Sequence, residues 1–210
     1  RMHLLLTDRL TCPRCGPEFG LILLADKLVD RVVHSGVLGC PNCRDAFEVE
    51  DGFADLRAPP RRGLEAGRAG DGKPPEDEQV ERVVALLGLH RGPGTVATLG
   101  SAAVFAAPIS ESVEDLMVVA VDSETRKWAL QNNVTRMVSS PGLPFFDRTL
   151  RGVVVDGGLG AALLFEACRC VSQMSRVVVL DAKPEAEEVV LEAGLSVLAI
   201  EQDTLVASRG

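Results

Sequence analysis

The sequence has no tyrosine, a single tryptophan and only 4% aromatic residues among its 210 residues. It also lacks an apolar run of about 18 residues, the length that a membrane-spanning helix needs. Lys and Arg form no cluster, and the formal net charge is −8. Because clustered positive charge is what neutralises phosphates, we expect no direct nucleic-acid binding. Because no apolar run is long enough, we expect no membrane span. The N-terminal stretch reaches Asp8 too soon for a secretory signal, so we expect a cytoplasmic protein.

Common enzyme signatures are missing as well. The sequence contains no Ser-His-Asp set, no phosphate-binding P-loop and only one constellation of metal-ligand type. Its hydrophobic fraction of 46% is ordinary for a globular protein and excludes disorder of the whole chain. At roughly 150 residues per domain, the length allows one or two domains.

Residues 58–75 divide the chain. They hold four prolines and four glycines in 18 residues, with 4 basic and 2 acidic side chains and no β-branched or aromatic one. This composition predicts a linker, and a long ordered surface loop is the alternative. We therefore expect an N-terminal module of residues 1–57 and a larger C-terminal module of residues 76–210, the latter with 11 basic and 19 acidic side chains.

Four cysteines form two Cys-Pro-x-Cys pairs, Cys12 with Cys15 and Cys40 with Cys43. Two residues between cysteines let one tight turn present both sulfurs to one ion, so the spacing favours a tetrahedral metal site over disulfides. Four thiolates predict a structural zinc ion with no open position for a substrate. Iron in a rubredoxin-like site is the main alternative, and a redox dithiol is a further one. We expect that so small a module needs its metal to fold.

The N-terminal module resembles a known family. Residues 4–10, the Cys-Pro-Arg-Cys turn, residues 36–43 and residues 47–56 together look like the small zinc-ribbon activator subunit of tRNA, rRNA and protein methyltransferases. The resemblance implies a β-rich ribbon that binds a methyltransferase through a sheet edge and hides an apolar surface on it. It leaves open whether the ribbon docks on its own larger module or on a second copy, and self-association is a further expectation.

In residues 76–210, apolar β-type runs alternate with helical patterns. This alternation predicts a doubly wound, mainly parallel sheet. The expected strands are residues 95–99, 116–121, 134–138, 152–155 and 176–180, followed by a hairpin of 196–200 and 204–207. The expected helices are residues 76–89, 123–131, 159–171 and 185–193.

This pattern of seven strands ending in a hairpin resembles that of the class I S-adenosylmethionine-dependent methyltransferases. Residues 86–100 resemble that family's first helix, turn and strand, and 118–124 its second strand with an acidic end. Residues 142–158 and 166–181 resemble later segments of the ubiquinone-biosynthesis type. The fold class that we expect is α/β, with a small zinc ribbon followed by a Rossmann-like, seven-stranded methyltransferase-type sheet.

The sequence departs from this second family where the cofactor would bind. The family's acidic residue and Gly-x-Gly-x-Gly loop are replaced by Thr98 to Phe105, with Gly100 as the one glycine. Glycines are needed where backbone approaches a cofactor closely. Gly100, Asp122 and Asp156 remain as candidates for binding S-adenosylmethionine, Asp122 through the ribose hydroxyls. A helix cap is the alternative for Asp122, and a turn for Asp156.

Three functions remain open, and no catalytic residue is assigned. The first is a zinc-binding protein whose methyltransferase-like module is non-catalytic and acts as scaffold, regulator or dimerisation module. The second is an active methyltransferase with an atypical cofactor loop, and the third is an activator subunit of a separate methyltransferase. Either a protein partner or self-association is expected. Cys168 and Cys170 lie about 200° apart on a predicted helix, which favours buried, inert thiols.

Overall fold

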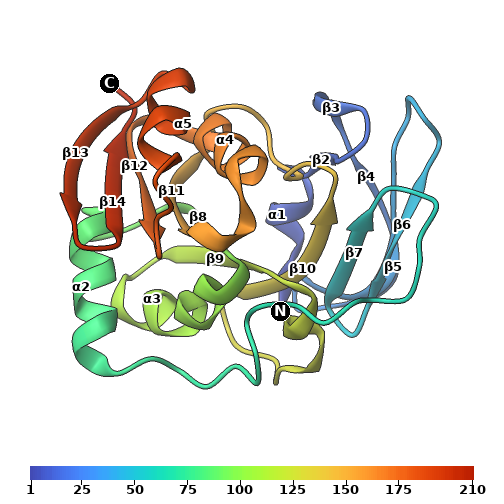
Figure 1. Cartoon of the computed structure of the whole chain (residues 1–210). Coiled ribbons are helices and arrows are strands. Elements are labelled where there is room, and N and C mark those ends of the chain that lie inside the picture. Colours follow the sequence, from blue (N-terminus) through green and yellow to red (C-terminus); the bar gives the residue numbers. More distant parts are fainter.

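The computed structural model of the chain describes all 210 residues (Figure 1). The strands are β1 (Met2–His3), β2 (Thr11–Cys12), β3 (Gly16–Gly20), β4 (Ile22–Val29), β5 (Val32–Gly39), β6 (Ala46–Glu50), β7 (Phe53–Arg57), β8 (Gly94–Leu99), β9 (Leu116–Val121), β10 (Val134–Ser140), β11 (Leu150–Asp156), β12 (Val171–Leu180), β13 (Ser196–Glu201) and β14 (Thr204–Ser208). The helices are α1 (Leu4–Thr7), α2 (Asp77–Leu87), α3 (Ala106–Ser112), α4 (Ala161–Cys170) and α5 (Ala186–Glu192), with 3₁₀ helices η1 (Gly100–Phe105), η2 (Ser123–Lys127) and η3 (Gly157–Leu159).

Twelve strands form one mixed sheet. Its order is β1-β5-β6-β7-β10-β9-β8-β11-β12-β14-β13, with β4 paired to β5, while β2 and β3 form a separate pair. The strands from β7 to β12 in this order are parallel, and β14 is antiparallel to β12. The sheet is larger than the seven strands expected, because β7 pairs with β10 and joins the N-terminal strands to the rest.

The central strands are apolar because both faces of the sheet are covered. Residues 153–155 of β11, for example, are all valines with no exposed surface. Leu6, Leu164 and Val190 place α1, α4 and α5 against one face in a core cluster of 35 buried residues. A second cluster of 19 residues includes side chains of α2 and α3 on the other face. The larger part is therefore a three-layer α/β structure, as the alternating pattern predicts.

The N-terminal strands dock on the chain's own sheet. β7 and β10 pair in parallel, with Met137 opposite Ala54 and Ser139 opposite Leu56 (Figure 1). Phe47, Leu56 and Met137 are all fully buried in the 35-residue cluster, which also contains side chains of α4 and α5. The resemblance left open whether the ribbon docks on its own larger module or on a second copy. In this structure it docks on its own larger module, because the edge of β7 is paired with β10 of the same chain.

Arg136 of β10 strengthens the junction between the two parts. Its buried guanidinium donates to the carbonyl oxygen of Asp51 at 2.8 Å, and also to the carbonyl oxygens of Thr125 and Trp128. Burial lowers the pKa of this guanidinium from its ordinary value. The carbonyl oxygens stabilise the buried cation, which links the turn after β6 to the segment after β9.

Some expected elements differ from the observed ones. The expected helix of residues 123–131 is wrong beyond η2, because Trp128 turns to an extended conformation. Helix α3 was not expected, and β12 begins five residues before the predicted start at Arg176. The C-terminal hairpin of β13 and β14 is confirmed.

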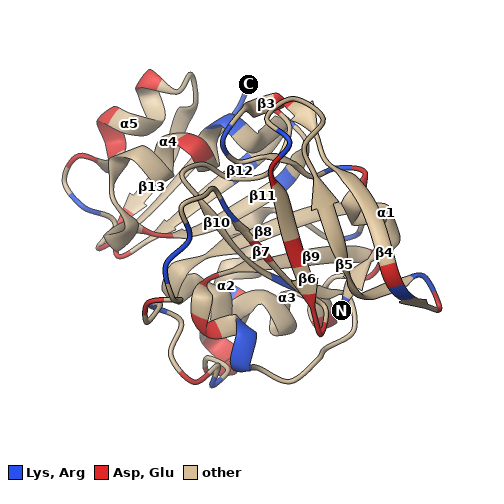
Figure 2. Ribbon diagram, turned by 90° about the vertical axis from the view of Figure 1, so that its right-hand side faces the viewer, with Lys and Arg blue, Asp and Glu red and all other residues tan.

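Residues 58–75 contain no helix or strand and run from β7 to α2 (Figure 1). In Figure 2, the Lys and Arg positions are scattered along the ribbon among Asp and Glu positions. None of the helices has both the length and the apolar character needed to cross a membrane.

Candidate functional site

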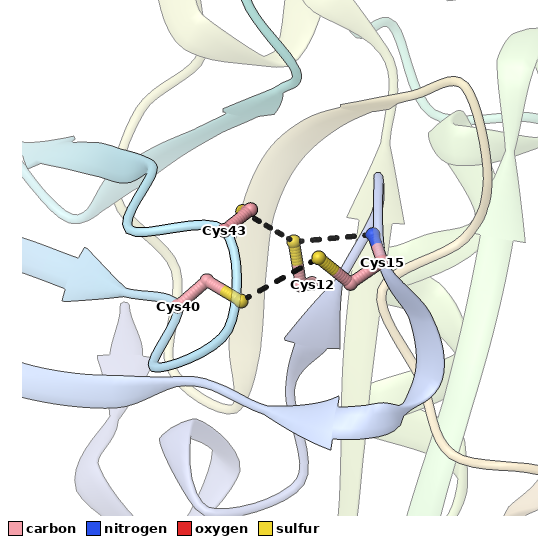
Figure 3. Close-up of side chains that lie close together, drawn as sticks. All are labelled: Cys12, Cys15, Cys40 and Cys43. Carbon is pink, nitrogen blue, oxygen red and sulfur yellow. Dashed lines mark hydrogen bonds between the residues drawn. The ribbon is translucent and has the colours of Figure 1, made fainter.

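The first candidate site is formed by the four paired cysteines. Cys12 ends β2 and Cys15 lies in the turn between β2 and β3, whereas Cys40 and Cys43 come from the turn after β5. The four side chains point toward one another (Figure 3). All four sulfurs lie within 4.8 Å of one another, and none forms a disulfide. Two segments that are distant in the sequence, one from the β2–β3 pair and one from the end of β5, thus bring their sulfurs to one point.

The geometry of these sulfurs fits a tetrahedral metal ion. The sulfurs of Cys12 and Cys43, and those of Cys40 and Cys15, are each 3.8 Å apart. Four thiolates at about 2.3 Å from a zinc ion would have nearly the same separation. Asn42 donates a hydrogen bond to the sulfur of Cys15 at 3.3 Å, and this bond lowers the pKa of that thiol. A donor of this kind orients a ligand from the second shell of atoms around a metal.

The other two cysteines have no such arrangement. Cys168 and Cys170 are fully buried on α4, as predicted. Burial raises the pKa of each thiol to about 12, so both are protonated and unreactive at neutral pH. His3 caps α1 by accepting the amide hydrogen of Leu5, which is a local structural role.

The second candidate site lies at the carboxyl ends of the parallel strands. The strand order reverses its direction of growth between β8 and β11, and ligands of doubly wound sheets bind in the crevice at such a point. Asp122 directly follows β9, and Asp156 is the last residue of β11. As whole residues, Asp122 is 8% exposed and Asp156 is 1% exposed. The structure therefore places both predicted aspartates at the edge where the resemblance expects a cofactor.

Both aspartates also cap short 3₁₀ helices. Asp122 accepts the amide hydrogen of Glu124 at 2.9 Å, and Asp156 accepts that of Gly158 at 2.8 Å. Asp156 accepts a further hydrogen bond from the amide of Ser101 at 3.2 Å. These bonds match the structural alternatives given above, and the role of these residues in cofactor binding stays a prediction.

Gly100 begins η1, which stands where the family has its glycine loop. Its φ of +66° favours glycine, and a Cβ there would lie 2.8 Å from the side chain of Leu159. Ala102, Ala103 and Phe105 of η1 are buried in the core cluster shared with α2 and α3. The glycine therefore serves a tight turn and close packing, while side chains fill the space beside it.

The crevice contains a segment that sequence reasoning missed. Glu65 to Gly70, which we call the strap, crosses the carboxyl ends of β9 and β11. The amide of Arg68 donates to Asp122 at 2.9 Å, and its guanidinium donates to Asp156 at 2.5 and 3.3 Å. The amide of Gly67 donates to Glu124 at 3.1 Å. The aspartates expected to bind a cofactor thus bind the chain's own backbone and an arginine side chain.

Arg68 dominates the electrostatics of this site. Burial alone would raise the pKa of Asp156, but hydrogen bonds from Arg68, Gly158 and Ser101 outweigh it and lower the pKa to about 2. Asp156 is therefore ionised at neutral pH and paired with a half-exposed cation. The only sequence signals for this contact were the net positive charge of residues 58–75 and their glycines, and neither points to Asp156.

Comparisons with known proteins give similarity of fold but no family. No family model matches the chain, and no curated protein matches it. Among solved structures, a geranyl diphosphate methyltransferase in complex with SAM (S-adenosylmethionine) matches 70% of this chain and 97% of its own, at 12% identity and a TM-score of 0.52. A chain from the complex between the Haloferax volcanii Trm112 methyltransferase activator and a putative methyltransferase matches 61% of this chain and 87% of its own, at 14% identity and a TM-score of 0.49.

A third match is the magnesium protoporphyrin IX methyltransferase of Synechocystis PCC 6803 with bound SAM, which covers 63% of this chain and 79% of its own at 16% identity and a TM-score of 0.47. The similarity to the geranyl diphosphate enzyme agrees with the observed strand order, which is parallel from β7 to β12 and ends in an antiparallel hairpin. The chain therefore has a methyltransferase-like, Rossmann-type α/β fold.

Proposed function

We propose that this chain is a zinc-binding protein whose methyltransferase-like module is non-catalytic and serves as a scaffold or regulator, with its zinc ribbon docked on the same chain. The proposal keeps the division into a ribbon of residues 1–57, a linker of 58–75 and an α/β module of 76–210. One observation carries it: η1 puts buried alanine and phenylalanine side chains where the resembling enzymes have a glycine loop.

Zinc is proposed from the donor set. Four converging thiols at tetrahedral separations, two of them buried, match a structural zinc site and leave no position for a substrate. When bound, the ion would hold the turn between β2 and β3 against the turn after β5. Iron binds the same set of ligands and is the alternative. Metal analysis of the purified protein distinguishes zinc from iron.

The absence of catalysis is proposed from sterics. The cofactor loop that the resemblance implies relies on glycines, which let backbone approach a cofactor closely, whereas η1 carries alanine, valine and phenylalanine after Gly100. Of the two predicted aspartates, Asp156 is paired with Arg68 and Asp122 accepts two amide hydrogens, so neither carboxylate is free. The position of Asp122 at the end of β9 still supports the competing proposal of an active methyltransferase.

The role of a separate activator subunit receives less support. In the family that the ribbon resembles, a sheet edge binds the methyltransferase, and here the edge of β7 is already paired with β10. A partner would therefore meet another surface. Strand β4 exposes Ile22, Leu24, Leu28 and Val29, each at least 46% exposed, and is the apolar surface that we propose for a protein partner or self-association.

Calorimetric titration of the metal-loaded chain with S-adenosylmethionine tests the central claim. We expect no heat of binding up to about 1 mM ligand, which corresponds to less than about 4 kcal/mol of binding free energy. S-adenosylhomocysteine, titrated in the same way, controls for cofactor breakdown. Micromolar binding of either ligand would contradict the proposal and favour an active methyltransferase.

A further inference from the structure

The strap, Glu65 to Gly70, occupies the one place where the topology of the sheet predicts a ligand. Crevices of this fold lie at the carboxyl ends of the strands on either side of the topological switch point, here β8 and β11. We propose that the strap is the resident ligand of this crevice, so that the chain itself closes the site to any diffusible ligand. This inference rests on the proposed function, because it takes the crevice to be that of a methyltransferase-like module.

Side chains of the segment from Asp122 to Trp128 form hydrogen bonds with the backbone of the strap at both of its ends and in its middle. The hydroxyl of Ser123 donates to the carbonyl oxygen of Glu65 at 2.8 Å, and the indole of Trp128 donates to that of Gly70 at 3.3 Å. Between them, the amides of Gly67 and Arg68 donate to Glu124 and Asp122. A loop that merely crosses the surface would leave these groups to water.

The strap also fits the crevice closely. A Cβ on Gly67 would collide with the carboxylate of Asp122 and with the hydroxyl of Ser123. Ala69 is 6% exposed and belongs to the core cluster that contains η1. By contrast, a Cβ on Gly63, four residues before Gly67, would meet no atom within 4 Å. Within the strap the close approach is therefore local to Gly67, since a Cβ on Gly70 would also meet no atom within 4 Å.

Charge provides the third part of the fit. Asp156 is 1% exposed, and a carboxylate at that depth needs a partner. The fork of Arg68 supplies two hydrogen bonds to it, one to each oxygen. A diffusible ligand would have to displace this cation, the two amides and Ala69 together, so the seated strap and such a ligand exclude each other.

Limited trypsin digestion of the full-length, metal-loaded chain tests directly whether the strap stays bound in the crevice. Trypsin needs an extended, accessible segment, and the strap contains a cleavage position after Arg68, with another just before it after the exposed Arg62. We expect initial cleavage after Arg68 to be at least about tenfold slower than after Arg62, because it requires local opening. Equal rates at the two positions would overturn the proposal.

A variant that adds a bulky side chain to the strap, together with a matched control outside it, sharpens this test. Gly67→Leu should expel the strap and raise cleavage after Arg68 by about tenfold, whereas Gly63→Leu should change it by less than about twofold. Unchanged protection in Gly67→Leu would also overturn the proposal. If Gly67→Leu fails to fold, Arg68→Lys keeps the charge and the cleavage position but loses the fork, and should raise cleavage about threefold.

The failures of the two proposals remain distinguishable. Cofactor binding by the wild-type chain in calorimetry would overturn the proposed function. Equal cleavage after Arg62 and Arg68 would overturn only the resident strap, since the digestion contains no cofactor.

Discussion

The cysteine cluster and the crevice each bring together acidic side chains from distant parts of the chain: four thiols in the cluster, and the carboxylates of Asp122 and Asp156 in the crevice. The two sites differ in the groups that compensate the negative charge. The four sulfurs surround one point, and Arg14, which lies between Cys12 and Cys15 in the sequence, pairs with Asp45. The carboxylates of Asp122 and Asp156 already receive the strap, and Arg68 pairs with Asp156. Buried charge needs compensation, and here one site calls for an ion from outside while the other is compensated from within.

This difference predicts how much each site contributes to stability. A metal bound by four thiolates contributes its binding free energy to folding, because the unfolded chain has no preformed site. An arginine on a tethered strap contributes only a local interaction, and Arg68 is 47% exposed to water. We therefore expect large effects at the cysteine cluster and small effects at the crevice.

The largest effect should follow Cys40→Ser. Loss of one thiolate from the cluster should release the metal and lower the free energy of unfolding by about 5 kcal/mol or more. Metal content by elemental analysis and urea unfolding followed by circular dichroism measure the two quantities. The buried Cys168 offers the control, because Cys168→Ala should keep one metal ion per chain. A Cys40→Ser chain with unchanged stability would remove the proposed contrast between the two sites.

A smaller effect tests whether the two regions unfold together. Phe47 lies in β6 and is fully buried in the core cluster that also contains β11 and α4 side chains. Phe47→Ala should lower the free energy of unfolding by about 3–5 kcal/mol in a single transition. Leu24→Ala, at a position 68% exposed, should change it by less than about 0.5 kcal/mol. Two separate transitions would show that the ribbon unfolds on its own.

The cysteine cluster could be predicted from sequence because its information is local. In each pair only two residues separate the cysteines, so one turn suffices to bring Cys12 close to Cys15. The C-terminal hairpin and strand β9 follow from local apolar runs in the same way, and both are confirmed. The metal itself stays a prediction, because the spacing indicates the ligands and not the ion.

The crevice could not be predicted in the same way, because its contacts are long-range. Arg68 and Asp156 are 88 residues apart, and composition alone had indicated a linker for the residues around Arg68. The expected helix after Asp122 fails for a related reason, since Trp128 leaves the helical conformation and its indole binds Gly70 of the strap. The pairing of β7 with β10 is likewise tertiary and adds strands that no local pattern counts.

The smallest effect concerns Arg68 and sharpens the comparison through pH. Arg68→Ala should lower the free energy of unfolding at pH 7 by about 1 kcal/mol, since water screens the half-exposed cation while Asp156 loses a partner. The ordinary pKa of an aspartate is 3.8, and in the folded chain that of Asp156 is about 2. A lowered pKa stabilises the fold at pH values above 3.8, and this contribution disappears as the pH falls from 3.8 through 2.

Urea unfolding of wild type and Arg68→Ala between pH 7 and pH 3 measures this difference. The difference in free energy of unfolding between the two chains should stay constant from pH 7 to pH 5 and begin to shrink below about pH 4. Without Arg68, the pKa of Asp156 lies closer to its ordinary value, so Asp156 of the variant takes up its proton at a higher pH than Asp156 of the wild type. Metal release on acidification affects both chains and cancels in the difference. Arg62→Ala removes an exposed arginine that precedes the strap, and should show no such pH dependence. A difference that already changes between pH 7 and pH 5 would mean that another group titrates with Arg68, and that Asp156 is not its principal partner.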